Sequence, residues 1–288
     1  MYYFPETVKI QEIKEHTFEK CTSLTTISIP QSVRKIGKYS FKDCSALTEL
    51  ELPSSLNAIG ICAFDGCQML KQMTIPSSVT NIESSAFGNC SSLSQVTIPS
   101  SFNYIGDFCF DDCVNLLDVN FSTCEKISNC SSMIGNNAFN NCSSLKQITI
   151  PSSVNVICSN VFKSCKSLKQ ITILSSIDEI KDGTFNDCSD LMQIIIPSSV
   201  KKIGSNAFLD CKALTQIDIP DSVNKICSFA FAGCSSLKEI TISKNVTEIE
   251  AFAFKGCTSL TKAHVSSSTK IDESSFDDCL NVQVMIAD

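Results

Sequence analysis

The 288-residue chain contains no tryptophan, four tyrosines and only two histidines. Proteins often hold sugars and bases against exposed aromatic rings, so this scarcity argues against an aromatic stacking groove. The histidines, His16 and His264, lie near opposite termini. We therefore expect no His–His or His–Cys metal site. With histidine this scarce we also expect no Cys–His or Ser–His nucleophile pair.

Other functional signatures are missing as well. No run of 18 apolar residues occurs, so no membrane-spanning segment is expected. The first ten residues, MYYFPETVKI, lack the basic and apolar regions of a secretory signal. No Walker-type or G-x-G-x-x-G phosphate loop and no C-x-x-C pair is present. The net charge is −7, without a Lys/Arg stripe, which disfavours a nucleic-acid partner. We predict no catalytic residue, no metal and no cofactor.

A regular spacing of cysteines is the strongest positive signal. Twelve of the 18 cysteines form one series, in which nine of the eleven intervals are 23 residues: Cys21, Cys44, Cys67, Cys90, Cys113, Cys142, Cys165, Cys188, Cys211, Cys234, Cys257 and Cys279. A phenylalanine precedes each by three positions, from Phe18 to Phe276. A fixed period of this length is typical of a solenoid, in which each repeat packs only on its neighbours. We predict one solenoid domain over residues 1–288, with about 12 coils.

The chemistry of the cysteines follows from their position in the repeat. A cysteine that recurs beside a core phenylalanine behaves as a small buried hydrophobic residue, so we interpret the twelve as buried thiols. Some disulfides or a metal site stay as alternatives. Six cysteines lie outside the series: Cys62, Cys109, Cys124, Cys130, Cys158 and Cys227. So many thiols indicate either a reducing compartment or deep burial.

One repeat, residues 24–46 (LTTISIPQSVRKIGKYSFKDCSA), shows the expected secondary structure. Ile27 and Ile29 alternate with polar residues, which is the period of a strand. Pro30 ends that strand, because proline has no amide hydrogen. A second short extended segment reaches Ile36, and Gly37 then permits either a positive φ or a tight corner. The remainder up to the cysteine predicts a tight turn or a short 3₁₀ segment. Equivalent strands would stack in parallel, about 4.8 Å apart.

The repeats resemble the BspA-like, or treponemal-type, leucine-rich repeats, whose pattern is L-x-x-I-x-I-P-x-x-V-x-x-I-G-x-x-A-F-x-x-C-x-x. Residues 93–115 (LSQVTIPSSFNYIGDFCFDDCVN) and 214–236 (LTQIDIPDSVNKICSFAFAGCSS) follow it closely. The resemblance implies a mostly β, right-handed solenoid with a parallel sheet formed by the L-x-x-I-x-I segments. It also implies a surface protein that adheres to host or matrix proteins, and hence a cell-surface location. The missing signal peptide and the many thiols favour the cytoplasm instead, so the location stays open.

Outward positions of the predicted strands form the candidate binding surface. One column is rich in glutamine and another in threonine, and Leu174 replaces the usual proline. The candidate protein-binding residues are Gln72, Gln95, Gln147, Gln170, Gln193, Gln216, Thr149, Thr172, Ile195 and Leu174. With Met192, the last two form a possible exposed apolar cluster, which is either an interface or harmless variation. Stacked glutamines can hydrogen-bond along a ladder or contact a partner, and the two roles can coexist.

Two irregularities interrupt the pattern. Six additional residues fall within 122–133, where Ser122 replaces proline and Cys124 and Cys130 occur. This insertion is interpreted as a tolerated loop, with a Cys124–Cys130 disulfide or a partner contact as alternatives. The terminal segments, Val8–Ile10–Ile13 and Val282–Met285–Ala287, show no clear polar cap. Because unpaired terminal strands template pairing, end-to-end self-association is possible.

Taken together, these features predict a non-catalytic protein-binding surface. The resemblance makes a BspA-like surface adhesin or antigen the first hypothesis. An intracellular interaction scaffold or a structural spacer is the alternative.

Overall fold

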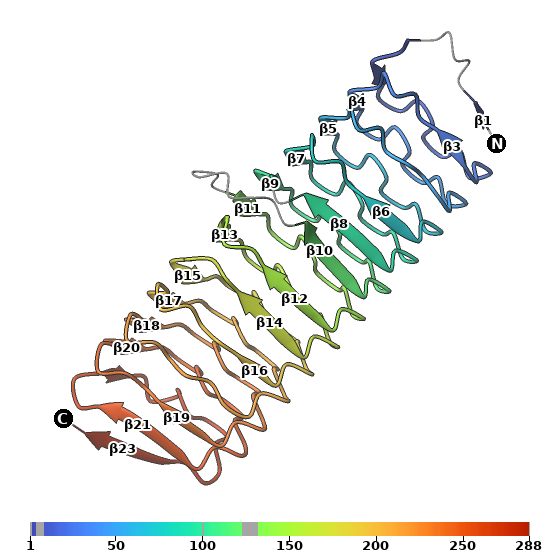
Figure 1. Ribbon diagram of the computed structural model, residues 1–288. Helices are drawn as coiled ribbons and strands as arrows, with labels where there is room; N and C mark the ends of the chain where they lie inside the picture. The colour runs from blue at the N-terminus through green and yellow to red at the C-terminus, as the bar shows by residue number, and fades with distance from the viewer. Residues whose placement is uncertain (1, 4–8, 100, 123–131, 288) are drawn as a thin grey trace. The chain divides into compact units, whose positions relative to one another are not determined.

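The structure is a computed structural model that describes residues 2–3, 9–99, 101–122 and 132–287. The chain forms two compact units, Met1–Leu145 and Lys146–Asp288. In both, most turns of chain carry two short strands, which stack in parallel on those of neighbouring turns (Figure 1). The predicted leucine-rich-repeat solenoid is confirmed, with about 12 turns and no helix among the described residues.

In the first unit, the L-x-x-I-x-I segments form what we call the main sheet. Its strands are β1 (Tyr2–Tyr3), β3 (Ile27–Ser28), β6 (Gln72–Thr74), β8 (Gln95–Pro99) and β10 (Asp118–Ser122). β1 pairs with β3, and β6, β8 and β10 pair side by side. The second sheet stacks in the order β2 (Glu12–Ile13), β4 (Lys35–Ile36), β5 (Ala58–Ile59), β7 (Asn81–Ile82), β9 (Tyr104–Ile105) and β11 (Ser132–Ile134).

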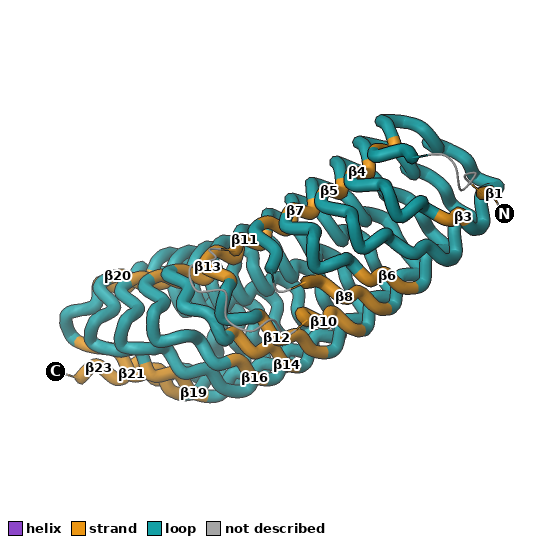
Figure 2. Tube along the Cα trace, turned by 45° about the horizontal axis from the view of Figure 1, so that its top comes forward, coloured by secondary structure: helices purple, strands orange, loops and turns teal. Residues whose placement is uncertain are grey.

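The second unit repeats this arrangement. Its main-sheet strands are β12 (Gln147–Ile150), β14 (Gln170–Ile173), β16 (Gln193–Ile194), β19 (Glu239–Thr241), β21 (Lys262–Ser266) and β23 (Gln283–Ala287). They pair as β12-β14-β16 and β19-β21-β23. Its second-sheet strands are β13 (Val154–Ile157), β15 (Glu179–Ile180), β17 (Lys202–Ile203), β18 (Lys225–Ile226), β20 (Glu248–Ile249) and β22 (Lys270–Ile271). Figure 2 shows the main-sheet strands β14, β16 and β19 on one side of this unit and β20 on the other.

Stacked phenylalanines fill the core of each unit, as the spacing predicts. The rings of Phe41 and Phe64 lie 5.2 Å apart at 11° in the first unit, and those of Phe208 and Phe231 lie 5.1 Å apart at 2° in the second. These four side chains are completely buried. Since each ring contacts its copies in neighbouring turns, a repeated position in the sequence becomes a continuous row in the core.

The tight turn between the second sheet and the cysteine contains no 3₁₀ helix in any described repeat. It is built from consecutive hydrogen-bonded turns, in which Ser40 N–H donates to Gly37 O and Cys44 N–H to Phe41 O. Left-handed residues interrupt it: Tyr39 and Asp43 have φ of 57°. The expected turn is therefore present, but these residues prevent a helical run from forming.

Gly37 does not have the positive φ that was one of its two predicted roles. It is buried, and a Cβ atom built on it would lie 2.7 Å from the backbone of Ile13 and Glu15 in the preceding turn. The other expectation, a tight corner, is what the structure shows. Glycine is needed here because two backbones approach too closely for any side chain.

The predicted insertion at 122–133 is described only at its two edges. Ser122 ends β10 in register with Pro99, and Met133 lies in β11 opposite Tyr104. Both edges of the segment therefore belong to regular strands. Residues 123–131, and with them Cys124 and Cys130, lie outside the described residues.

Candidate binding surface

Strand alternation places the predicted glutamines on the outer face of each main sheet. In the first unit, Gln72 pairs in register with Gln95. In the second, Gln147 pairs with Gln170 and Gln170 with Gln193. All are exposed, whereas the residues that follow them along the strands, such as Ile148 and Ile171, are buried. The period of two therefore directs each amide outward and each isoleucine into the core.

The second unit contains most of the candidate residues. Gln216 is exposed one turn beyond Gln193, in a segment that forms no strand. Thr149 and Thr172 pair in register and are exposed. No hydrogen bond joins the glutamine amides to one another among the described residues. Their donors and acceptors therefore face solvent rather than forming a ladder.

An apolar cluster interrupts this polar face. Ile195 is 85% exposed, Leu174 60% and Met192 48%. Leu174 follows β14, and Met192 and Ile195 flank β16, which pairs directly with β14. The cluster therefore lies across two neighbouring turns of the second unit. Large apolar side chains with this exposure on a polar sheet are candidates for an interface.

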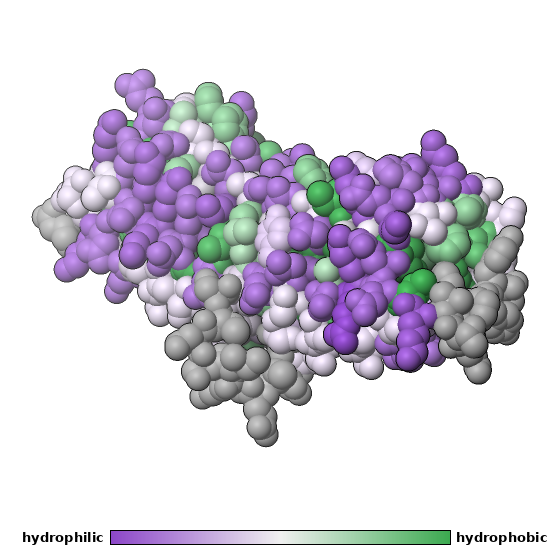
Figure 3. All heavy atoms as spheres, turned by 90° about the horizontal axis from the view of Figure 1, so that it is seen from above, coloured by the Kyte–Doolittle hydropathy of each residue, from purple (hydrophilic) through white to green (hydrophobic). Residues whose placement is uncertain are grey.

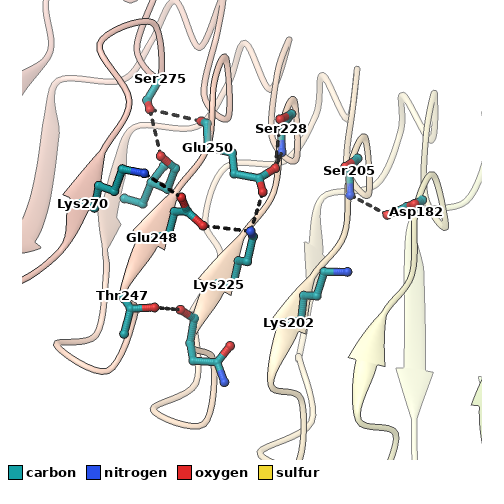
Figure 4. A network of polar contacts seen from close by, with 12 residues as sticks. Asp182, Lys202, Ser205, Lys225, Ser228, Thr247, Glu248, Glu250, Lys270 and Ser275 are labelled. Atoms are coloured by element: carbon teal, nitrogen blue, oxygen red, sulfur yellow. Dashed lines mark hydrogen bonds and ion pairs between the residues drawn. The ribbon is translucent and has the colours of Figure 1, made fainter.

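The second sheet of this unit carries charged side chains that sequence reasoning missed. Lys225 Nζ lies 2.8 Å from Glu248 Oε2 and 2.6 Å from Glu250 Oε1, and Lys270 Nζ lies 3.2 Å from Glu248 Oε1 (Figure 4). Glu250 also accepts hydrogen bonds from Ser228. The signal was present as a Lys-Ile or Glu-Ile pair in each second-sheet strand from β15 to β22, but opposite charges become partners only when the turns are stacked.

These contacts shift the titration of the charged groups. Hydrogen bonds from Lys225 and Lys270 lower the pKa of Glu248, and those to Glu248 and Glu250 raise the pKa of Lys225. Each pair links one turn to the next, so the network favours the correct register of the turns. Exposed ion pairs of this kind each contribute little to the stability of the fold.

The face seen in Figure 3 is mostly hydrophilic, with hydrophobic side chains only in small separate spots.

The cysteines of the regular series have a second role besides packing. Their thiols donate hydrogen bonds across the turns. From Cys44 to Cys113, for example, each thiol donates to the carbonyl oxygen of the phenylalanine in the preceding turn. The Sγ–O distance is 3.2 Å for Cys90 with Phe64 and 3.2 Å for Cys211 with Phe185. Burial raises the pKa of the Cys44 thiol to about 12. Thiols in this state stay protonated at neutral pH and are poor nucleophiles and metal ligands.

Each of the two histidines lies within hydrogen-bond distance of a glutamate. His16 Nδ1 lies 2.6 Å from Glu19 Oε2, and His264 Nε2 lies 3.1 Å from Glu239 Oε1. Within the described ranges, no group of three His, Cys, Asp or Glu side chains could hold a metal ion. The same part of the chain has no helix with the length and apolarity needed to cross a membrane.

Parallel stacked turns with two short strands and an apolar ladder define a leucine-rich-repeat protein. The chain belongs to the BspA type leucine rich repeat family, whose model matches residues 11–132, 123–224 and 201–286, in six copies. This finding confirms the resemblance read from the repeats.

Solved structures with the same fold include two that are 29% identical to this chain. One is a leucine rich cell surface protein from Faecalibacterium prausnitzii A2-165, with a TM-score of 0.60 over 99% of this chain and 87% of that chain. The other is a leucine-rich repeat protein from Bacteroides ovatus ATCC 8483, with a TM-score of 0.63 over 98% and 83%. The pneumococcal vaccine antigen PcpA shares the fold at 20% identity, with a TM-score of 0.53 over 98% and 85%. No curated protein matches the chain.

Proposed function

We propose that this chain is a non-catalytic protein-binding protein, and that it acts as a surface adhesin or antigen that contacts host or matrix proteins. Its membership of the BspA type family supports a role in protein interaction. The likeness to a cell surface protein of F. prausnitzii supports placement at the surface. The partner would bind the outer face of the main sheet in the second unit.

The observation that carries this proposal is the exposed apolar cluster among the outward glutamines. Ile195 stands in a column where the preceding turns have Thr149 and Thr172. Burying its side chain under a partner would contribute about 1.5–3 kcal/mol. The amides of Gln170 and Gln193 supply hydrogen-bond donors and acceptors beside it. An apolar centre with a polar rim is the usual anatomy of a protein interface.

The test compares two sets of lysine substitutions on the two sheets of the second unit. The first variant carries Gln147→Lys, Gln170→Lys and Gln193→Lys. The matched control adds the same charge beside the second sheet, at three exposed polar residues: Asn155→Lys, Asn224→Lys and Thr247→Lys.

Both variants and the wild type are titrated onto immobilised extracellular matrix proteins by biolayer interferometry. We expect saturable binding of the wild type and of the control, and a dissociation constant at least about tenfold higher for the glutamine variant. Ile195→Thr, which restores the threonine of the preceding turns, should also weaken binding. Equal affinity of the glutamine variant and the wild type, or no binding by the wild type, would reject the proposal.

An intracellular scaffold or spacer is the second candidate, and the buried thiols favour it. Cys67, Cys90 and Cys211 are completely buried and hydrogen-bonded as thiols, a state that suits a reducing compartment. Labelling of intact cells with an impermeant reagent distinguishes the two candidates. Labelled protein supports the adhesin, and labelling only after lysis supports the scaffold.

A further inference from the structure

Positive charge gathers beside the apolar cluster, on the turns of chain that carry β12 and β14. Residues 146–177 contain four lysines and no Asp, Glu or Arg, although the whole chain has a net charge of −7. All four lysines are exposed. We call them the basic belt: Lys146, Lys163, Lys166 and Lys169. The first acidic residue of the second unit is Asp178.

The basic belt is continuous with the apolar cluster. Lys146 directly precedes β12 and Lys169 directly precedes β14. The backbone N–H of Lys169 donates to Lys146 O at 2.9 Å, and that of Met192 donates to Lys169 O at 3.3 Å. These three residues therefore follow one another across neighbouring turns, with Ile195 at the other end of β16 from Met192.

Most of this charge has no partner within the protein. Lys166 Nζ lies 3.6 Å from Asp187 Oδ2. In the ranges that the structure describes, no carboxylate oxygen lies within 4.0 Å of the ammonium groups of the other three lysines. Lys146 and Lys169 are like charges on neighbouring turns, which is an unfavourable arrangement. A partner with negative charge would relieve it.

An acidic side chain lies on the other side of the cluster. In the turn that follows β16, Asp218 is exposed at the position equivalent to Ile195. A carboxylate on a partner would be attracted by the basic belt and repelled by Asp218. The charges on this face therefore favour one orientation of an acidic partner.

We propose that the protein partner presents an acidic segment to this surface, with carboxylates over Lys146 and Lys169 and an apolar side chain over Met192 and Ile195. This inference rests on the proposed function and specifies the chemistry of the partner at the same surface. Opposite charges around an apolar contact raise the association rate and fix the register of the partner.

The extent of the surface suits a short extended segment. Lys169 and Leu174 are five residues apart along β14, a distance of about 17 Å for an extended strand. The glutamine column, which contains Gln170, lies between the basic belt and Ile195. Lysines introduced into that column would therefore lie under the centre of the contact, where a buried charge without a partner is costly.

A random peptide library displayed on phage tests this chemistry without assuming a particular partner. The library is selected in parallel on the immobilised full chain and on the double variant Lys146→Glu and Lys169→Glu. We expect the wild type to select peptides that combine Asp or Glu with an apolar residue. These peptides should bind the double variant with a dissociation constant at least about tenfold higher. The double variant should itself select basic peptides, which shows that its surface is intact.

Two control variants separate local charge from net charge. Lys201→Glu with Lys244→Glu makes the same change of charge at two exposed lysines outside the basic belt. Lys146→Arg with Lys169→Arg keeps the positive charge in place. Both controls should bind the selected peptides as the wild type does, and circular dichroism confirms that each variant is folded.

Ile195→Thr distinguishes failure of this inference from failure of the proposed function. Selected peptides that are not enriched in Asp or Glu, but still bind Ile195→Thr more weakly, would overturn the acidic partner and leave the binding surface in place. Peptides that bind the wild type and every variant equally, or a library from which nothing is enriched, would overturn both.

An immobilised heparin column tests the other source of negative charge. Retention of the wild type that is lost in the Lys146→Glu and Lys169→Glu variant, without selection of acidic peptides, would assign the two lysines to a sulfated glycan and overturn the proposal. Selection of acidic peptides together with equal retention of both chains on heparin would support it.

Discussion

Phe208 offers the sharpest test of the stacked core, because its ring lies between two others. Its centroid is 5.2 Å from that of Phe185 and 5.1 Å from that of Phe231, and the side chain is completely buried. Phe208→Ala removes the buried ring and leaves a cavity, which typically destabilises a protein by about 3–5 kcal/mol. Each ring pair adds about 0.5–1.5 kcal/mol beyond area burial. We therefore expect a loss near the upper end of the range, about 5 kcal/mol.

Phe276 provides the matched control at the same repeat position. It is partly exposed, and one ring contact is described for it, with Phe254 at 5.1 Å. Phe276→Ala should cost about 2 kcal/mol, since less area and one ring contact are lost. The free energies come from urea unfolding followed by circular dichroism. Because repeat arrays can unfold in parts, hydrogen exchange should locate the loss around Phe208. Equal losses for the two variants, within about 0.5 kcal/mol, would refute the argument that the stack holds the core together.

Two further predictions concern the thiols and the close backbone contacts. Burial raises the pKa of Cys44 from 9.0 to about 12, so the folded state favours the protonated thiol. The contribution of this thiol to the free energy of unfolding is complete below about pH 9 and is lost as the pH rises toward 12. The free energy of unfolding should therefore fall between pH 8.5 and 11, less steeply in Cys44→Ala, and a flat profile would contradict this reasoning. Gly37→Ala should destabilise the chain by about 1–3 kcal/mol because the new Cβ meets backbone atoms at 2.7 Å. Gly88→Ala is the control, because its Cβ would lie 3.1 Å from the Asp65 side chain rather than from backbone. It should lower the free energy of unfolding, measured by urea titration, by less than Gly37→Ala does. A larger loss for Gly88→Ala would contradict the argument that the close backbone contact at Gly37 requires glycine.

Much of the candidate binding surface could be located from the sequence. Strand alternation alone directs Gln170 and Gln193 outward, and the break in the threonine column singles out Ile195.

The sequence by itself determined the repeat and its core. A period of 23 residues brings the same side chain to the same place in successive turns, so Phe208 and Phe231 must stack once the turns do. Only the tertiary structure decided how the turns interact through polar groups. The hydrogen bond from the Cys211 thiol to Phe185 O and the ion pairs of Lys225 with Glu248 and Glu250 join residues about one repeat apart. Whether such groups meet depends on the spacing of the turns and the direction of each side chain, which residue order alone does not specify.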